Sequence, residues 1–154
     1  MKKMCVVWWG LKEGNKLANI NSYLTFNGNC KEAMHFYQDC LGGELTLQSI
    51  GESAMAGDMP QIMADKILHA VLVVNDIVIM GTDLVDEGGW ISGNTVALML
   101  NCDTALETKV CYEKLARGGK ASHPLQETFW GSLFGNLVDR YGNNWLINYD
   151  KKFL

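Results

Sequence analysis

The feature that most constrains the fold of this chain of 154 residues is an internal repeat. The double glycine at Gly42 and Gly43 recurs as Gly118 and Gly119, an offset of 76 residues, and each pair ends a segment with helical spacing of apolar residues. The same offset places Leu24 on Leu100. Self-similarity at a fixed offset indicates that one supersecondary unit is present twice, so we expect two similar modules.

Each copy has the same predicted order of elements, in which a strand and a helix are followed by further strands. In the first copy the strands are expected over residues 20–26, 44–50, 68–74 and 77–82, and the helix over 29–41. In the second copy they are expected over residues 95–101, 133–138 and 145–149, with the helix over 104–116. Both helices begin at a capping-box signal, Asn29 with Glu32 and Thr104 with Glu107.

This order predicts an α+β fold in which two βαβββ modules form a curved, mostly antiparallel sheet. A helix covers only one face of each module, so the uncovered faces are expected to form a concave site. We expect a single domain over residues 17–154, with modules at about 20–83 and 95–149. In the connector over residues 51–66, Met55, Met59 and Met63 lie four apart, which favours a helical stripe facing the core over a lid.

Residues 1–16 precede the repeated pattern and are expected to be an extension of doubtful status. Lys12, Glu13 and Gly14 can be encoded by a ribosome-binding sequence, and Leu17 by a TTG start codon, so our hypothesis is that the natural protein begins near Leu17. The alternative is that residues 6–9 pack against the core. A signal peptide is not favoured, because the apolar stretch is very short and no small-x-small cleavage site follows it.

Composition and charge exclude several classes of function. The formal charge is -4 at pH 7 and Lys and Arg form no cluster, so no nucleic-acid partner is expected. No apolar run reaches the length that crosses a membrane, so no membrane partner is expected either. The five cysteines form no CxxC pair, which favours reduced thiols and a cytoplasmic location over disulfides or a zinc site.

Several stretches together resemble one protein family. They are FNG at residues 26–28, EAMHFYQDCLGGE at residues 32–44, His69 with Ala70 at the start of a strand, and FWG followed by DRYGNNW at residues 129–145. Over about residues 20–149 the chain resembles the PhnB-like branch of the vicinal-oxygen-chelate (glyoxalase/bleomycin-resistance/dioxygenase) superfamily. Some members of this branch carry the label 3-demethylubiquinone-9 3-methyltransferase. The chain has no glycine-rich strand-to-helix loop of the kind that grips a nucleotide-like methyl donor.

The resemblance implies a homodimer, and it implies where a metal would lie. Metal-using relatives bind a divalent ion with His, Glu or Gln from the first and last strands of each module. The corresponding positions fall within residues 20–22 and 96–98 and near Ile79 and Leu146, and none carries an imidazole or a carboxylate. No metal and no cofactor are therefore predicted. The alternative is a relocated metal site built from His69, His123 and Glu127.

Six side chains are candidates for contact with a ligand: His69, His123, Gln126, Glu127, Trp130 and Phe134. His69 interrupts an apolar strand, and an imidazole there can bind a ligand or transfer a proton, or simply be a structural histidine. Gln126 and Glu127 point to opposite faces of an extended segment, so at most one reaches the site. His69 and Glu127 are the catalytic candidates. Phe129 and Trp130 are expected either to line a pocket or to cap the core, and the cysteines to be inert.

The leading hypothesis is a metal-free protein that binds a small organic molecule in an apolar cavity. His69, Gln126 or Glu127 would supply its polar points, and Trp130 and Phe134 its aromatic walls. Whether the protein is an enzyme stays open. One alternative is a lyase, isomerase or dioxygenase with a non-standard metal site, which requires three converging ligand atoms. The other is a bleomycin-resistance-type binding protein, which requires an open aromatic groove at a dimer interface without converging acid and base groups.

Overall fold

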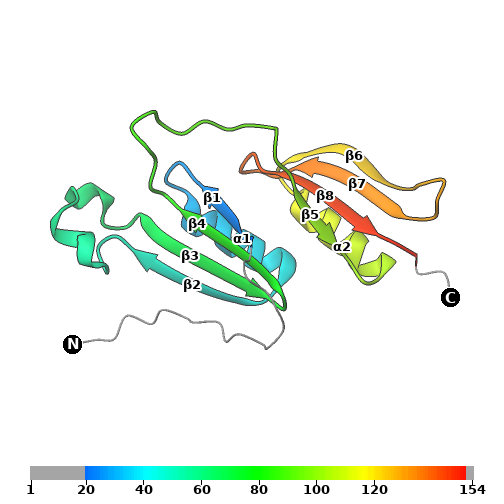
Figure 1. Cartoon of the computed structure of the whole chain (residues 1–154), viewed down its shortest axis with the longest axis horizontal. Coiled ribbons are helices and arrows are strands. Elements are labelled where there is room, and N and C mark those ends of the chain that lie inside the picture. Colours follow the sequence, from blue (N-terminus) through cyan, green and yellow to red (C-terminus); the bar gives the residue numbers. More distant parts are fainter. Residues whose placement is uncertain (1–19, 152–154) are drawn as a thin grey trace.

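The computed structural model describes residues 20–151, and it contains two modules with the predicted βαβββ order (Figure 1). The first comprises β1 (Ser22–Thr25), α1 (Cys30–Leu41), β2 (Glu44–Ser49), β3 (Ile67–Val74) and β4 (Ile77–Thr82). The second comprises β5 (Leu98–Asn101), α2 (Ala105–Leu115), β6 (Lys120–Glu127), β7 (Leu133–Val138) and β8 (Asn144–Tyr149). The α+β class and the duplication are therefore confirmed. The predicted extension at residues 1–16 lies outside the described residues.

Each module forms its own four-stranded sheet, with the strand orders β1-β4-β3-β2 and β5-β8-β7-β6. The first strand of each module pairs in parallel with the last, and all the other pairs are antiparallel. One helix lies against one face of each sheet, on the far side in the view of Figure 1. We call the opposite face of each sheet its open face. The first strands, β1 and β5, are edge strands.

The two helices begin in different ways. At α2 the predicted cap is present, because the Thr104 side chain accepts a hydrogen bond from the Glu107 amide at 3.1 Å. At α1 the predicted cap is wrong, because the Asn29 side chain makes no capping hydrogen bond. Instead, the buried Asp83, just after β4, accepts a hydrogen bond from the Cys30 amide at 2.9 Å. Long-range contact therefore replaces the local cap in the first module.

The modules share one hydrophobic core and are joined by a buried carboxylate. Asp139, in the turn between β7 and β8, is only 3% exposed. It accepts hydrogen bonds from the Tyr37 hydroxyl of α1 at 2.6 Å and from the Trp145 indole of β8 at 2.8 Å. The backbone amides of Tyr141 and Asn143 also donate to it. Because Tyr37 belongs to the first module, Asp139 fixes that helix to the second module.

Two sequence expectations about local structure were wrong. The methionine connector is not one helical stripe facing the core; it forms two short 3-10 helices, η1 (Ala54–Gly57) and η2 (Gln61–Met63), which contain no buried residue. Pro60 lies between them, and proline has no amide hydrogen with which to continue a helix. In the second module, β5 begins at Leu98 rather than at residue 95, and β6 had not been located from the sequence. No helix of the described chain is long and apolar enough to cross a membrane.

Candidate ligand-binding site

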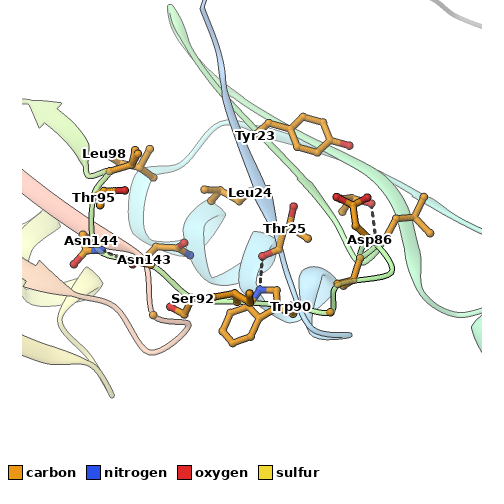
Figure 2. Close-up of a pocket in the computed structure, with 18 residues that line it drawn as sticks. Tyr23, Leu24, Thr25, Asp86, Trp90, Ser92, Thr95, Leu98, Asn143 and Asn144 are labelled. Atoms are coloured by element: carbon orange, nitrogen blue, oxygen red, sulfur yellow. Dashed lines mark hydrogen bonds between the residues drawn. The ribbon is translucent and has the colours of Figure 1, made fainter.

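The larger cavity lies where the two modules meet, and its volume is about 650 Å³ (Figure 2). Its walls come from β1, from the start of β5, from the turn before β8 and from the connector between the modules. In Figure 1 this connector arches from β4 to β5 across the gap between the two sheets. A volume of this size is typical of small-molecule sites.

The cavity combines apolar walls with mostly neutral polar groups. Tyr23, Leu24 and Leu98 come from the edge strands, and Trp90 comes from the connector. Hydroxyl and amide groups also line it, and Asp86 is the one charged residue among its lining residues. Such a surface suits an uncharged organic molecule better than an anion, because it offers no cationic partner.

Two hydrogen bonds hold the connector against the modules. The Trp90 indole donates to the backbone oxygen of Thr25 at 2.9 Å, which ties the connector to β1 (Figure 2). The Asn144 side chain of β8 donates to the backbone oxygen of Gly93 at 3.3 Å. The connector is otherwise without regular secondary structure, and residues 86–97 are all exposed. It is therefore a wall of the cavity that is attached to both modules.

The candidate His69 lies on the open face of the first sheet. Its ring stacks on that of Tyr23, with ring centroids 6.0 Å apart, and Tyr23 also lines the larger cavity. His69 is half-buried and pairs with Gln48 of β2. It is not a lining residue of the cavity itself, so it borders the cavity through Tyr23.

Three other candidates share the open face of the second sheet. The register pairs His123 with Asn136 and Gln126 with Phe134, so His123, Gln126 and Phe134 point to the same side. On β5 and β8 of this face, the Asn148 side chain donates to the Asn101 side chain at 3.1 Å. His123 lines a second cavity of about 250 Å³, whereas Gln126 and Phe134 line neither cavity.

Glu127 and Trp130 lie at the end of the β6–β7 hairpin. Glu127 pairs with Leu133, so it points to the face opposite to that of Gln126. Phe129 and Trp130 pack edge to face with centroids 4.4 Å apart, but they are 97% and 57% exposed. In the single chain both rings are therefore exposed, and they line neither of the two cavities.

The positions implied for a metal contain no suitable donors. Ser22 pairs with Ile79, and Leu98, 76 residues after Ser22, pairs with Trp145. Ile79 therefore corresponds to Trp145 and not, as expected from the sequence, to Leu146. The number of residues between the last strands of the two modules is therefore one fewer than the sequence alignment of Ile79 with Leu146 implies. A one-residue slip in register exchanges the two faces of a strand.

After this correction, the open-face residues nearest to the implied metal positions are Tyr23, Met80, Met99 and Leu146. None of these side chains offers the imidazole or carboxylate that a divalent ion requires. Within residues 20–151, no three His, Cys, Asp or Glu side chains are close enough to hold a metal, so His69, His123 and Glu127 do not form the relocated site. The residues therefore do not fit the metal of the superfamily.

The thiols differ between the modules. Burial, together with the nearby Asp83, raises the pKa of Cys30 from 9.0 to about 12. In the second module a hydrogen bond from Cys102 lowers the pKa of Cys111 to about 7. Cys111 is nevertheless buried, which limits the access of a reaction partner to its sulfur. Inert packing stays our prediction for these thiols.

Sequence reasoning missed the buried Asp139 and its partners. Burial, followed by the adjacent Asp139 carboxylate, raises the pKa of Tyr37 above its usual range, so the hydroxyl stays a hydrogen-bond donor. The sequence did contain a signal for this contact. Asp139 and Trp145 are the acid and the tryptophan of the FWG-x-x-x-G-x-x-x-D-x-x-G-x-x-W pattern, which spans FWG and DRYGNNW at residues 129–145. That part of the pattern serves the packing of the modules.

Comparisons with known proteins agree with this architecture. A family model described as 3-demethylubiquinone-9 3-methyltransferase matches residues 18–148. Protein YjdN of Escherichia coli (strain K12) is 31% identical over 147 residues, which cover 86% of this chain and 96% of YjdN. The crystal structure of protein PA1353 from Pseudomonas aeruginosa is 36% identical with a TM-score of 0.78, covering 86% of this chain and 98% of that one.

More distant structures show the same fold. A Bacillus cereus protein described as PhnB is 23% identical with a TM-score of 0.66, covering 86% of this chain and all of that one (100%). Structures described as glyoxalase-related or as glyoxalase/bleomycin resistance proteins match with 12 to 19% identity and TM-scores of 0.55 to 0.59. The expected glyoxalase-type fold is therefore confirmed.

Proposed function

The chain belongs to the protein family described as 3-demethylubiquinone-9 3-methyltransferase, and we propose that it binds a small, uncharged organic molecule in the cavity between its modules. The observation that carries this proposal is the cavity of about 650 Å³ at the junction of β1, β5 and the connector. The cavity has two aromatic side chains, Tyr23 and Trp90, and a single charged residue, Asp86. Apolar walls with a few polar groups are typical of sites for such ligands.

The wall chemistry supports recognition by shape and neutral hydrogen bonds. Tyr23 and Trp90 offer flat surfaces for a ring, and the Thr25, Ser92 and Thr95 side chains offer hydroxyl groups. A ligand with a ring and one or two hydroxyl or carbonyl groups would match both the flat aromatic surfaces and the hydroxyl groups of the cavity. His69, stacked on Tyr23, would contact a ligand that extends past Tyr23 onto the open face of the first sheet.

The family description names methyl transfer, but the residues of this chain do not favour that reaction. The segment between β1 and α1 contains Phe26, Asn27, Gly28 and Asn29, with one glycine only. A nucleotide-like methyl donor is usually gripped by a glycine-rich turn between a strand and a helix, with the helix amides directed at the donor. We therefore propose binding and leave methyl transfer out of the proposal.

We also propose that two copies of the chain associate. The open faces carry apolar side chains, among them Met99, and the hairpin tip carries the exposed Phe129 and Trp130. Exposed aromatic pairs of this kind are enriched at protein interfaces. In a dimer, Gln126, Phe134 and Trp130 would contact a ligand or the second copy. Light scattering on the native protein and on a Phe129→Ser/Trp130→Ser variant tests this, and a wild-type monomer at micromolar concentration contradicts it.

A cytoplasmic location is part of the proposal as well. The described cysteines Cys30, Cys40, Cys102 and Cys111 are all free thiols. Free thiols persist in reducing compartments, which supports the cytoplasm.

The cavity is tested by filling it. Val96 lines the cavity from the exposed connector, so Val96→Trp should block it without disturbing the core. Gly88→Trp is the matched control, since Gly88 lies on the same connector, does not line the cavity and has no atom near an added Cβ. A library of uncharged ring compounds is screened by thermal shift on the wild type.

Hits should stabilise the wild type and the Gly88→Trp variant but lose at least tenfold in affinity for Val96→Trp. Hits that bind all three proteins equally would place the ligand elsewhere. A library without any hit would overturn the proposal for these compound classes.

A further inference from the structure

His123 and Asn136 form a polar pair on the open face of the second sheet, and neither residue lines the larger cavity. The His123 Nδ1 atom lies 2.8 Å from the Asn136 side-chain oxygen. That oxygen can only accept, so this contact selects the Nδ1–H tautomer of a neutral imidazole, in which Nε2 keeps a lone pair. The same contact leaves the Asn136 amide hydrogens free. The pair thus presents a hydrogen-bond acceptor, His123 Nε2, beside a hydrogen-bond donor, the Asn136 side-chain amide.

The backbone beneath the pair is fixed by Tyr112 of α2. Its buried hydroxyl lies 3.0 Å from the backbone oxygen of His123 and 3.3 Å from that of Asn136, so it can donate to either. Gly135 permits this approach, because an added Cβ would lie 3.0 Å from both the His123 backbone oxygen and the Tyr112 ring. The pairing of β6 with β7 is irregular on both sides of His123. The His123 side chain therefore points in a direction different from that in a regular strand.

The first module shows that the fold does not need this pair. The row of paired residues across the second sheet is Met99, Leu146, Asn136 and His123. The corresponding row in the first sheet is Tyr23, Met80, Val71 and Thr46. Phe36 occupies the α1 position that corresponds to Tyr112, and it has no hydroxyl. In this row the imidazole, the amide and the supporting hydroxyl belong to the second module only; the imidazole and the amide of the first sheet, His69 and Gln48, pair in a different row.

A cavity of about 250 Å³ adjoins the pair, and we infer that it is a second recognition site, for a neutral group with a hydrogen-bond donor beside an acceptor, such as a lactam or a primary carboxamide. The ligand N–H would donate to His123 Nε2, and its carbonyl oxygen would accept from the Asn136 amide. Ser122, Asn94 and Asn144 also line this cavity. No charged side chain lines it, so an anion or a cation finds no partner of opposite charge there.

The first test is the tautomer of His123, read from the ring nitrogen shifts in ¹⁵N-labelled protein. The chain has three histidines, and His123→Gln identifies the signal of interest. We expect the Nδ1–H form in the wild type and a mixture of both forms in Asn136→Leu. His35→Gln, which alters an exposed histidine of α1, is the control. A wild-type signal for the Nε2–H form would overturn the inference.

The second test titrates the protein with 2-pyrrolidone, a small lactam, and follows the His123 Nε2 shift. Cyclopentanone, which lacks the N–H, and acetate, which is charged, are the comparison probes. We expect the lactam to shift the signal in the wild type and to bind roughly fivefold or more weakly to Asn136→Leu, as the loss of one neutral hydrogen bond implies. The comparison probes should leave the signal unchanged.

Two further results would overturn the inference: equal response to the lactam and to cyclopentanone, or no response to the lactam up to about 100 mM, which lies beyond weak fragment affinities. The Val96→Trp variant should bind the lactam like the wild type, because Val96 lines only the larger cavity. Failure of this site is therefore distinguishable from failure of the proposed function.

Discussion

The two modules have the same strand order but different open faces. In the first sheet the row that crosses the centre is Tyr23, Met80, Val71 and Thr46, whereas in the second it includes Asn136 and His123. Across this row one copy of the unit carries aromatic, aliphatic and hydroxyl side chains, and the other carries an amide and an imidazole. The difference teaches that the two copies keep the same strand order while the side chains on their open faces vary.

The largest expected effect comes from removing Asp139, the buried side chain through which the two modules contact each other. Asp139→Ala should lower the free energy of unfolding by about 3–5 kcal/mol, because it leaves the Tyr37 hydroxyl and the Trp145 indole without their buried acceptor. Urea unfolding followed by circular dichroism measures the loss. Asp76→Ala, in the exposed β3–β4 turn of the first module, is the control and should change stability by less than about 0.5 kcal/mol. Equal losses would contradict the role of Asp139 as the contact that holds the modules together.

The caps of the two helices give a smaller contrast. Thr104→Ala should destabilise the protein by about 1 kcal/mol, because the Thr104 side chain caps α2. Asn29→Ala should have an effect below about 0.5 kcal/mol, since the Asn29 side chain makes no capping hydrogen bond. Thermal unfolding of both variants checks the order. If Asn29→Ala were the more damaging variant, the structural account of α1 would be wrong.

Alkaline pH should destabilise the protein through groups of both modules whose pKa is raised by burial. The pKa of Cys30 is raised from 9.0 to about 12 in the folded state, so the unfolded chain loses this proton first as the pH rises. The stabilisation is complete below pH 9 and disappears as the pH approaches 12. Tyr141, whose pKa is raised to about 12 by burial and by Glu32, acts in the same direction.

Urea unfolding of the wild type and of Cys30→Ala, at pH 8 and at pH 10.5, isolates the contribution of this thiol. The alkaline loss of stability should be smaller in Cys30→Ala. An identical loss in both proteins would assign the effect to the tyrosines alone.

The smallest expected effect is that of added metal. Mn, Fe, Ni, Co and Zn should each shift the melting temperature by less than about 1 °C, because the open-face positions on the first and last strands carry no metal-binding side chains. His69→Ala should behave like the wild type. Stoichiometric metal in protein purified without a tag, lost in His69→Ala, would reinstate the metal-dependent alternatives.

The sequence predicted the fold well because the repeat leaves strong local signals. The glycine pairs, the helix periodicity and the β-rich hairpins are all local, so both helices and most strands were located within a few residues. The β6 strand was missed because residues 120–124 are exposed and carry no alternation. The start of α1 was misread because its amide is satisfied by Asp83, 53 positions away from Cys30.

The site was harder to predict, because it depends on register and on contacts between the modules. The roles of His69 and His123 in a site stay predictions, and nothing local in the sequence indicates that His69 stacks on Tyr23 or that His123 meets Asn136. The larger cavity is lined mainly by β1 and by a connector that reads as a flexible loop. The roles of Glu127, Gln126, Trp130 and Phe134 in ligand binding stay predictions.

The buried Asp139 joint has a consequence for how the chain can be cut. Since α1 is held to the second module by Tyr37 and by the shared core, the covalent link through residues 84–97 is not what keeps the modules together. Cleavage between Gly88 and Gly89 should therefore yield two fragments that reassemble without covalent linkage. Because the cut segment is also a wall of the larger cavity, such a split protein would be a starting point for a ligand-responsive complementation sensor.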